Sequence, residues 1–267
     1  MMQLIAKMHG VEIPESPNYG QDVPGLAKGS AILGLLSSGV VIAHLIAFSS
    51  AGLFVMLRGG TNLSLGNVLF ITTLTILSIL FFSIAGFLIW SSRRGKLQMR
   101  DRVISGLQLR GDEEVLDVGC GNGLLLIGAA SHLTTGIATG VDIWRTDIES
   151  DVSPQSVIRN AELAGVADRV QVESADARDL PFENGRFDIV LTSFMLHHMN
   201  KQDRETAVQQ MTRVLKPGGK LVIVEIAHAA QLVAILQDGG FTTIRQPSLN
   251  LPLYKQIIAT KQSAPSA

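Results

Sequence analysis

The sequence predicts an α/β fold, a parallel sheet with helices on both faces, preceded by a pair of long uncharged helices. Three observations support this prediction. Apolar segments of strand length alternate with segments of helix length from residue 114 onward, and such alternation is typical of parallel sheets. A glycine-rich turn follows the first of these strands, and two uncharged stretches fill most of residues 29–92.

The individual elements follow from periodicity and from turn residues. Strands are expected at 114–118, 137–142, 169–173, 187–192, 220–225, 242–245 and 254–260. Helices are expected at 97–109, 123–133, 154–164, 202–215 and 228–238. A Lys-Pro-Gly-Gly turn at 216–219 ends a helix before the fifth strand. The chain then divides into a flexible tail at 1–29, an uncharged hairpin at 30–92, the α/β domain at 93–260 and a second tail at 261–267.

The glycine turn, Asp117–Gly123, reads DVGCGNG. Glycines 119, 121 and 123 let the backbone turn sharply and come close to a bound ligand. A dinucleotide fingerprint, GxGxxG, would place its third glycine at position 124, which is Leu124. The spacing therefore favours S-adenosylmethionine over NAD and counts against a nucleotide-cofactor oxidoreductase.

Acidic residues follow two further strands. Asp142 ends the second strand, where a carboxylate can accept hydrogen bonds from both hydroxyls of a ribose; its alternative role is a helix cap. Asp176 follows the third strand and can accept from an adenine amino group, with Ala177 as a backbone donor. The alternative for Asp176 is a turn-forming role before Arg178.

With these pieces in place, the chain resembles the class I S-adenosylmethionine-dependent methyltransferases, and most closely their branch of ubiquinone/menaquinone C-methyltransferases. The matching pieces, in order, are VLDVGCGNG, GVDI, ADARDLPFENGRFDIVLTSFMLHHM and RVLKPGGKLVIVE. The resemblance covers roughly residues 97–260. It implies a Rossmann-like seven-stranded methyltransferase sheet with an antiparallel final strand, and S-adenosyl-L-methionine as the cofactor.

The resemblance also assigns the rest of the cofactor site. The glycines at 119, 121 and 123 would admit the methionine part of the cofactor, while Asp117 would hold the turn or reach the amino group. Ile143 or Trp144 would pack on the adenine face. Thr192 would form part of the wall beside the sulfonium.

His197, His198 and Glu225 are the candidate catalytic residues. A sulfonium already carries a good leaving group, so the protein must align the acceptor and, for a hydroxyl or an activated carbon, help to remove a proton. An imidazole can take that proton near neutral pH. The alternative for the two histidines is a scaffolding role. Glu225 ends the fifth strand and is expected to face the same crevice.

The uncharged region predicts two membrane spans. No charged residue occurs for 29 positions between Lys28 and Arg58, or for 34 positions between Arg58 and Arg93. Since about 20 apolar residues at ~1.5 Å each cross a hydrocarbon core of about 30 Å, residues 31–57 and 68–90 are each long enough. The alternative is a pair of buried helices in a soluble core.

Basic residues predict the orientation of this hairpin. They crowd the exit of the second span, at Arg93, Arg94, Lys96, Arg100 and Arg102. By the positive-inside rule, both termini and the α/β domain lie in the cytoplasm. We therefore expect an integral membrane protein, of the cell membrane if bacterial, with the lipid bilayer as a partner. Small residues at every fourth position of the first span allow close helix packing, within the hairpin or in a homodimer.

Composition excludes other classes of protein. From Val103 onward the chain has 14 Lys and Arg against 19 Asp and Glu, which argues against a nucleic-acid substrate. Cys120 is the single cysteine, so no internal disulfide or multi-cysteine metal site can form, and no metal is expected.

The resulting hypothesis is a membrane-anchored methyltransferase that acts on a small, lipophilic acceptor. Two alternatives stay open: an anchored module that binds S-adenosylmethionine without turnover, and a methyltransferase for a soluble metabolite or a protein.

Overall fold

The computed structural model describes residues 16–19, 30–40, 42, 65–90, 94–145, 152–247, 249 and 254–263. The chain divides into two compact units, residues 21–95 and the remainder.

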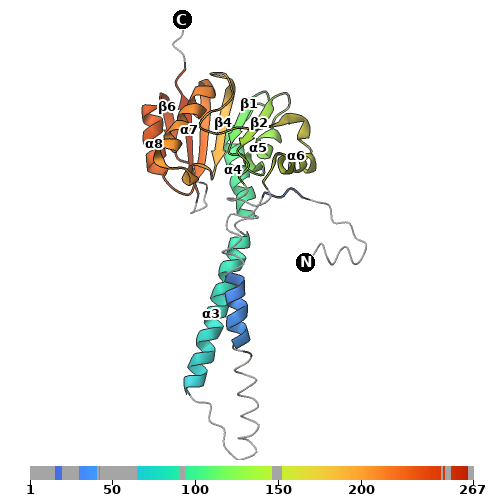
Figure 1. The fold of residues 1–267 in the computed structure, drawn as a ribbon, viewed down its shortest axis with the longest axis vertical. Helices are drawn as coiled ribbons and strands as arrows, with labels where there is room; N and C mark the ends of the chain where they lie inside the picture. Colours follow the sequence, from blue (N-terminus) through green and yellow to red (C-terminus); the bar gives the residue numbers. More distant parts are fainter. Residues whose placement is uncertain are drawn as a thin grey trace, which may run out of the picture. The chain divides into compact units, whose positions relative to one another are not determined.

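The larger unit is built on one seven-stranded sheet in the order β3-β2-β1-β4-β5-β7-β6 (Figure 1). Its strands are β1 (Glu114–Val118), β2 (Ile137–Asp142), β3 (Val170–Ser174), β4 (Phe187–Ser193), β5 (Leu215–Glu225), β6 (Phe241–Arg245) and β7 (Lys255–Lys261). Strands β1 to β5 run parallel, whereas β7 runs antiparallel to both of its neighbours. The predicted seven-stranded sheet and its reversed final strand are therefore confirmed.

Helices cover both faces of this sheet. They are α4 (Lys96–Leu107), α5 (Leu124–Ala130), α6 (Pro154–Leu163), α7 (Lys201–Val214) and α8 (Ala229–Asp238), with short 3-10 turns at η2 (Ala167–Arg169) and η3 (Leu196–His198). Residues of α4, α5 and α6 share one buried apolar cluster, and residues of α7 and α8 share another. Successive residues of β4, Ile189 and Val190, belong to different clusters, so the two clusters lie on opposite faces of the sheet.

Strand β5 starts earlier than its sequence predicts. The Lys-Pro-Gly-Gly segment was expected to precede a strand that begins at Lys220, but β5 already begins at Leu215, which pairs with Phe187. The register of β4 against β5 then shifts before Ile189 pairs with Lys220. Residues 216–219 are therefore an irregular bulge within the strand, and Gly218 takes a left-handed φ of +78° there.

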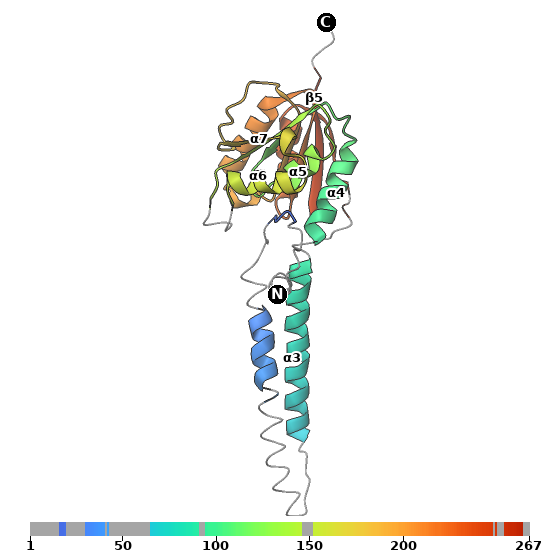
Figure 2. The ribbon, with the colours of Figure 1, turned by 90° about the vertical axis from the view of Figure 1, so that its right-hand side faces the viewer.

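The smaller unit contains two helices that pack on each other. They are the helix Ser30–Val40 and α3 (Leu65–Trp90), which run side by side in Figure 2. The Ser37 and Ser78 hydroxyls lie 2.8 Å apart, and a Cβ on Gly34 would meet the ring of Phe82 at 3.1 Å. The small residues at Gly34 and Ser37 thus contact α3 of the same chain.

One helix in the described part of the chain, Leu69–Phe87, is long and apolar enough to cross a membrane, judged by length and composition alone. It corresponds to the predicted span at 68–90. Of the predicted span at 31–57, only residues 31–40 and 42 are described, and the rest lies outside the described residues. The two-span hairpin is therefore not shown by the structure.

A short segment before the first uncharged stretch packs on the larger unit. Asn18 and Asn160 exchange two hydrogen bonds of 2.9 Å through the Asn160 side-chain amide and the Asn18 main chain. Lys96 donates to the Tyr19 carbonyl at 3.4 Å, and the Arg100 guanidinium lies 5.9 Å from the centre of the Tyr19 ring. Residues 16–19, expected in a flexible tail, thus contact α4 and α6, because polar partners 77 to 142 positions away hold them.

Candidate active site

The glycine turn after β1 has the close backbone geometry that its sequence predicts. Gly119, Gly121 and Gly123 have φ angles of +70°, +51° and +84°. A Cβ on Gly119 would lie 2.5 Å from the Met195 side chain, and one on Gly123 would lie 3.0 Å from Ile127. Larger residues would therefore both strain the backbone and fill the space beside it.

Asp142 ties this turn to the neighbouring strand. Its Oδ2 accepts a hydrogen bond from the Gly121 N–H, and its Oδ1 accepts one from the Trp144 N–H, each at 2.9 Å. A carboxylate can accept about four hydrogen bonds, so both oxygens keep acceptor capacity for ribose hydroxyls. The Trp144 indole donates to the Ser174 hydroxyl at 2.8 Å, which fixes this ring at the ends of β2 and β3.

Asp117 is buried directly beneath the turn, with 1% of its surface exposed. Its Oδ2 accepts from the Leu126 N–H at 2.9 Å, whereas Oδ1 has no hydrogen-bond partner among the described residues. Burial raises the pKa of this carboxyl to about 7. Asp117 therefore holds the start of α5, and its second oxygen is free to accept a bond from a ligand amino group.

Cys120, within the turn, is also buried, and burial raises the pKa of its thiol. A protonated, buried thiol is a weak nucleophile. Its sulfur lies 2.9 Å from where a Cβ on Gly140 would stand, so Cys120 serves here as a small packing residue.

Asp176 is engaged by Arg178. Its Oδ1 accepts from the Arg178 N–H at 2.8 Å, and the guanidinium reaches Oδ2 at 2.6 Å. These bonds lower the pKa of Asp176. Arg178 also lies 3.2 Å from Asp203. The geometry is that of the turn-forming alternative, and the adenine contact stays a prediction.

The other predicted cofactor contacts differ in their exposure. Ile143 is 51% exposed at the end of β2 and is accessible to a ligand. Ala177 is buried. Thr192 is fully buried, and its hydroxyl has no partner within the described residues. Their roles at the cofactor stay predictions.

The candidate catalytic residues lie next to each other at the carboxyl ends of β4 and β5. His197 Nδ1 lies 2.7 Å from Glu225 Oε2, and the Leu196 N–H donates to Glu225 Oε1 at 2.8 Å. Glu225 is 1% exposed. The ring centres of His198 and His197 lie 4.0 Å apart with the rings tilted by 41°, and burial, followed by the nearby His197, lowers the pKa of His198. The structure thus pairs His197, rather than His198, with the carboxylate.

Backbone strain marks the same edge of the sheet. Trp144, Phe194 and His228 have left-handed φ angles of +55°, +55° and +60°, and each follows the carboxyl end of a parallel strand. Such conformations cost roughly 1–3 kcal/mol in non-glycine residues and cluster at functional sites. Phe194 also packs against Tyr254, with ring centres 5.2 Å apart.

Two features of the site escaped the sequence analysis. One is Arg204, a buried arginine on α7 that packs against η3 (Leu196–His198), which we call the histidine turn. Its spacing from Ala207, Val208 and Met211 places it on the buried face of that helix, and this was the available signal. The other is the contact of residues 16–19 with Asn160, whose side chain also donates to the Asn122 carbonyl in the glycine turn at 3.0 Å. No local sequence signal indicates that contact.

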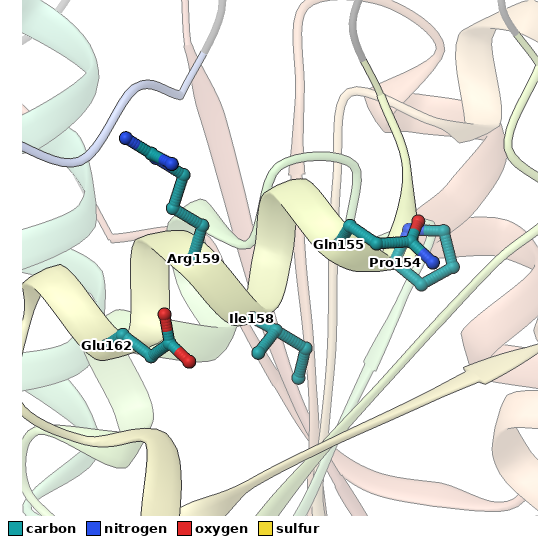
Figure 3. Close-up of a pocket in the computed structure, with 5 residues that line it drawn as sticks. All are labelled: Pro154, Gln155, Ile158, Arg159 and Glu162. Atoms are coloured by element: carbon teal, nitrogen blue, oxygen red, sulfur yellow. The ribbon is translucent and has the colours of Figure 1, made fainter.

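A shallow hollow lies apart from these residues, along α6 (Figure 3). It is lined by Pro154, Gln155, Ile158, Arg159 and Glu162. All five belong to one helix, and Arg159 extends from a different side of it than Ile158 (Figure 3). The hollow contains none of the predicted site residues.

Comparison with known proteins agrees with this site. Residues 115–219 match the family described as a methyltransferase domain. The chain is 37% identical over 126 residues to 27-O-demethylrifamycin SV methyltransferase of Amycolatopsis mediterranei, covering 47% of this chain and 43% of that protein. It is 34% identical over 130 residues to demethylmenaquinone methyltransferase of Staphylococcus aureus, covering 48% and 49%. The chain thus spans about half the length of these curated relatives.

The fold is also found in solved structures. An O-methyltransferase family protein from Burkholderia thailandensis superimposes with a TM-score of 0.54 at 16% identity, over 71% of this chain and 61% of that one. The solved structure supports the fold, and the sequence matches indicate the class. Residues 115–219 are similar to methyltransferase domains, and this similarity implies S-adenosylmethionine as the cofactor.

Proposed function

We propose that this protein is a membrane-anchored methyltransferase that methylates a small, lipophilic acceptor. The observation that carries the proposal is that one chain joins the methyltransferase domain to the apolar helix Leu69–Phe87. Ile76, Ile79 and Leu80 on that helix are at least half exposed. Apolar side chains exposed along such a length are stabilised by a lipid environment.

The anchor we propose is the two-span hairpin with both termini in the cytoplasm. Five arginines and lysines between residues 93 and 102 support this orientation. A cytoplasmic domain tethered to the bilayer is placed where a lipophilic acceptor concentrates. The names of two relatives, which act on demethylrifamycin and demethylmenaquinone, support a small organic acceptor. A homodimer through the spans is compatible with this arrangement.

The residues around the glycine turn fit the cofactor. The space beside Gly119 and Gly123, which a Cβ would fill, allows close approach to the backbone, and the free Oδ1 of Asp117 can accept from an amino group. Asp142 would hold the ribose hydroxyls. When bound, S-adenosylmethionine supplies the methyl group: the acceptor atom bonds to the methyl carbon as the carbon–sulfur bond breaks, and the bond pair stays on sulfur.

His197 is the base that we propose for this reaction. With Nδ1–H donated to Glu225, the imidazole offers Nε2 to the acceptor proton, and the carboxylate stabilises the imidazolium that forms. The burial of Glu225 strengthens this interaction, because water does not screen it. This arrangement suits an acceptor hydroxyl or an activated carbon acid, since both lose a proton on methylation.

The test is incubation of membranes that contain the protein with S-adenosylmethionine labelled in the methyl group, followed by separation of lipid, aqueous and protein fractions. Label in the lipid fraction, strongly reduced with Asp142→Ala and with His197→Asn, is the expected result. Label in the aqueous or protein fraction alone would replace the lipophilic acceptor by a soluble metabolite or a protein. Binding of the cofactor without release of S-adenosylhomocysteine, in the presence of lipid extract, would favour a binding module.

A further inference from the structure

Helix α7 carries a buried arginine directly beneath the histidine turn. Arg204 is 4% exposed. Its Nε donates to the Leu196 carbonyl at 3.0 Å, its Nη2 donates to the Met199 carbonyl at 2.8 Å, and its Nη1 donates to the Gln231 side-chain oxygen. The guanidinium thus binds the carbonyl of Leu196, the first residue of η3 (Leu196–His198), and that of Met199, the residue directly after η3.

The same peptide segment is held from its other side by Glu225. The Leu196 N–H donates to Glu225 Oε1, while the Leu196 carbonyl accepts from Arg204. The second oxygen of Glu225 contacts His197 Nδ1. One residue of main chain therefore connects the arginine to the carboxylate that orients the histidine.

The chemistry of this position requires an arginine. Burial of a cation is costly unless its hydrogen-bond donors are all engaged. The guanidinium is a planar fork with five donors and can bind several carbonyls at once, whereas the lysine ammonium is a point charge on a flexible stem. A structure that needed only to fill this space could use an apolar residue, as Ala207, Val208 and Met211 do on the same face of α7.

We propose that Arg204 is a positioning residue for the His197–Glu225 pair. By fixing the carbonyls at both ends of the turn, it keeps His197 Nδ1 against Glu225 and so leaves Nε2 as the nitrogen that takes the acceptor proton. The inference rests on the proposed role of His197 as the base. It does not require the acceptor to be known, because the tautomer of His197 is observable in the protein itself.

The experiment is nitrogen NMR of the full chain in detergent micelles, with ¹⁵N-labelled histidine, at about pH 8, where an ordinary imidazole is neutral. His197→Asn assigns the resonance. We expect the Nδ1–H tautomer in the unmodified protein, and a shift toward Nε2–H in Arg204→Met. Arg204→Lys keeps the charge but not the fork, so it should restore the tautomer only in part.

Arg213→Met is the matched control. Arg213 lies on the same helix and also binds carbonyls, those of Phe182 and Leu180 at 2.7 and 2.8 Å, but it has no contact with the histidine turn. Its replacement should leave the His197 tautomer unchanged. If Arg204→Met does not fold, Arg204→Lys decides the question.

The inference is overturned if the tautomer is unchanged in the folded Arg204 variants, or if Arg213→Met shifts it equally. The labelling experiment of the proposed function fails separately. If the His197 tautomer depends on Arg204 but the protein transfers no label, the positioning role of Arg204 stands and the proposed methyl transfer is wrong. Label transfer that persists in His197→Asn would instead remove the base.

Discussion

The Gly121 N–H donates to Asp142 Oδ2 at 2.9 Å, so the glycine turn after β1 and the acid that ends β2 form one unit. This bond keeps the two elements adjacent. Because the ribose and methionine parts of S-adenosylmethionine belong to one molecule, we expect the cofactor to contact both elements at once.

Asp142→Ala tests this unit. The variant loses the two main-chain bonds to Asp142 and the two expected ribose bonds, and bonds to a charged acceptor are worth about 1.5–3 kcal/mol each. We expect the affinity for S-adenosylmethionine to fall at least about tenfold. Calorimetry measures it, with Asp142→Asn, which keeps one oxygen, as the intermediate case. Unchanged binding in the alanine variant would refute the ribose assignment.

Gly119→Ala should destabilise the protein more than Gly165→Ala does. Both glycines have φ near +70°, but a Cβ on Gly119 would meet Met195 at 2.5 Å, whereas nothing lies within 4 Å of one on Gly165. The left-handed conformation alone costs about 1–2 kcal/mol in alanine, so Gly165→Ala measures that part. Denaturant unfolding gives both values. Equal losses would show that the contact with Met195 relaxes without cost.

Asp117 predicts a pH dependence of stability. Its pKa is raised from 3.8 to about 7 in the folded protein because it is buried. The folded state therefore binds the Asp117 proton more tightly than the unfolded state does. The stability that this proton contributes to the folded state is fully present below about pH 4 and is lost as the pH rises toward 7. Three pKa units correspond to about 4 kcal/mol as an upper value.

Asp117→Asn removes this titration. Relative to the unmodified protein, the variant should gain stability progressively between about pH 4 and 7 and show no further change above that range. Urea unfolding at a series of pH values, without S-adenosylmethionine, provides the measurement. A difference in stability that stays constant with pH would contradict the buried, protonated carboxyl.

Reporter fusions test the proposed topology. Reporters after Ala267 and before Met1 should both indicate the cytoplasm, and one placed between Gly59 and Asn67 should indicate the opposite side. Substituting the arginines at 93 and 94 by glutamine should weaken this preference. A carboxyl terminus outside the cytoplasm would separate the domain from its cofactor and overturn the model of function.

Two shortened proteins test the segment 16–19. One begins at Ser91, and the other keeps residues 1–20 joined to Lys96 by a short glycine-serine linker. Only the second preserves the bonds of Asn18 to the Asn160 side chain, which is 4% exposed. Since an unsatisfied buried polar group costs about 1–3 kcal/mol, we expect lower thermal stability for the first. Equal melting temperatures would mean that water replaces Asn18 without cost.

The sequence predicts the parts of this molecule that depend on local pattern. The strands β1, β2 and β4 and the glycine turn agree with it, because alternation of elements and turn chemistry are encoded within a few residues. The reversed β7, by contrast, was expected from the family resemblance. The bulge at 216–219 was not predicted, since Leu215 pairs with Phe187 on another strand. The left-handed Trp144 and Phe194 were not predicted either, because tertiary contacts impose a backbone conformation that their residue types disfavour.

The sequence predicted which residues belong to the candidate site better than it predicted the contacts between them. His197 and Glu225 were both named, but their 2.7 Å contact depends on a turn held by Arg204, which lies on a different element. For Asp176, both the adenine role and the turn-forming role before Arg178 were predicted. The structure shows the bond of Asp176 to Arg178, two residues away, and the adenine contact stays a prediction.

The bonds between Asn18 and Asn160 also constrain the order of events during synthesis. These residues are 142 positions apart, so the ribosome must complete β1, β2 and most of α6 before Asn18 has this partner. Contacts of Tyr19 with Lys96 and Arg100 of α4 can form earlier, because α4 precedes β1 in the chain. The Asn160 side chain, which also donates to the Asn122 carbonyl in the glycine turn, therefore joins this turn to the segment 16–19 only after α6 has left the ribosome.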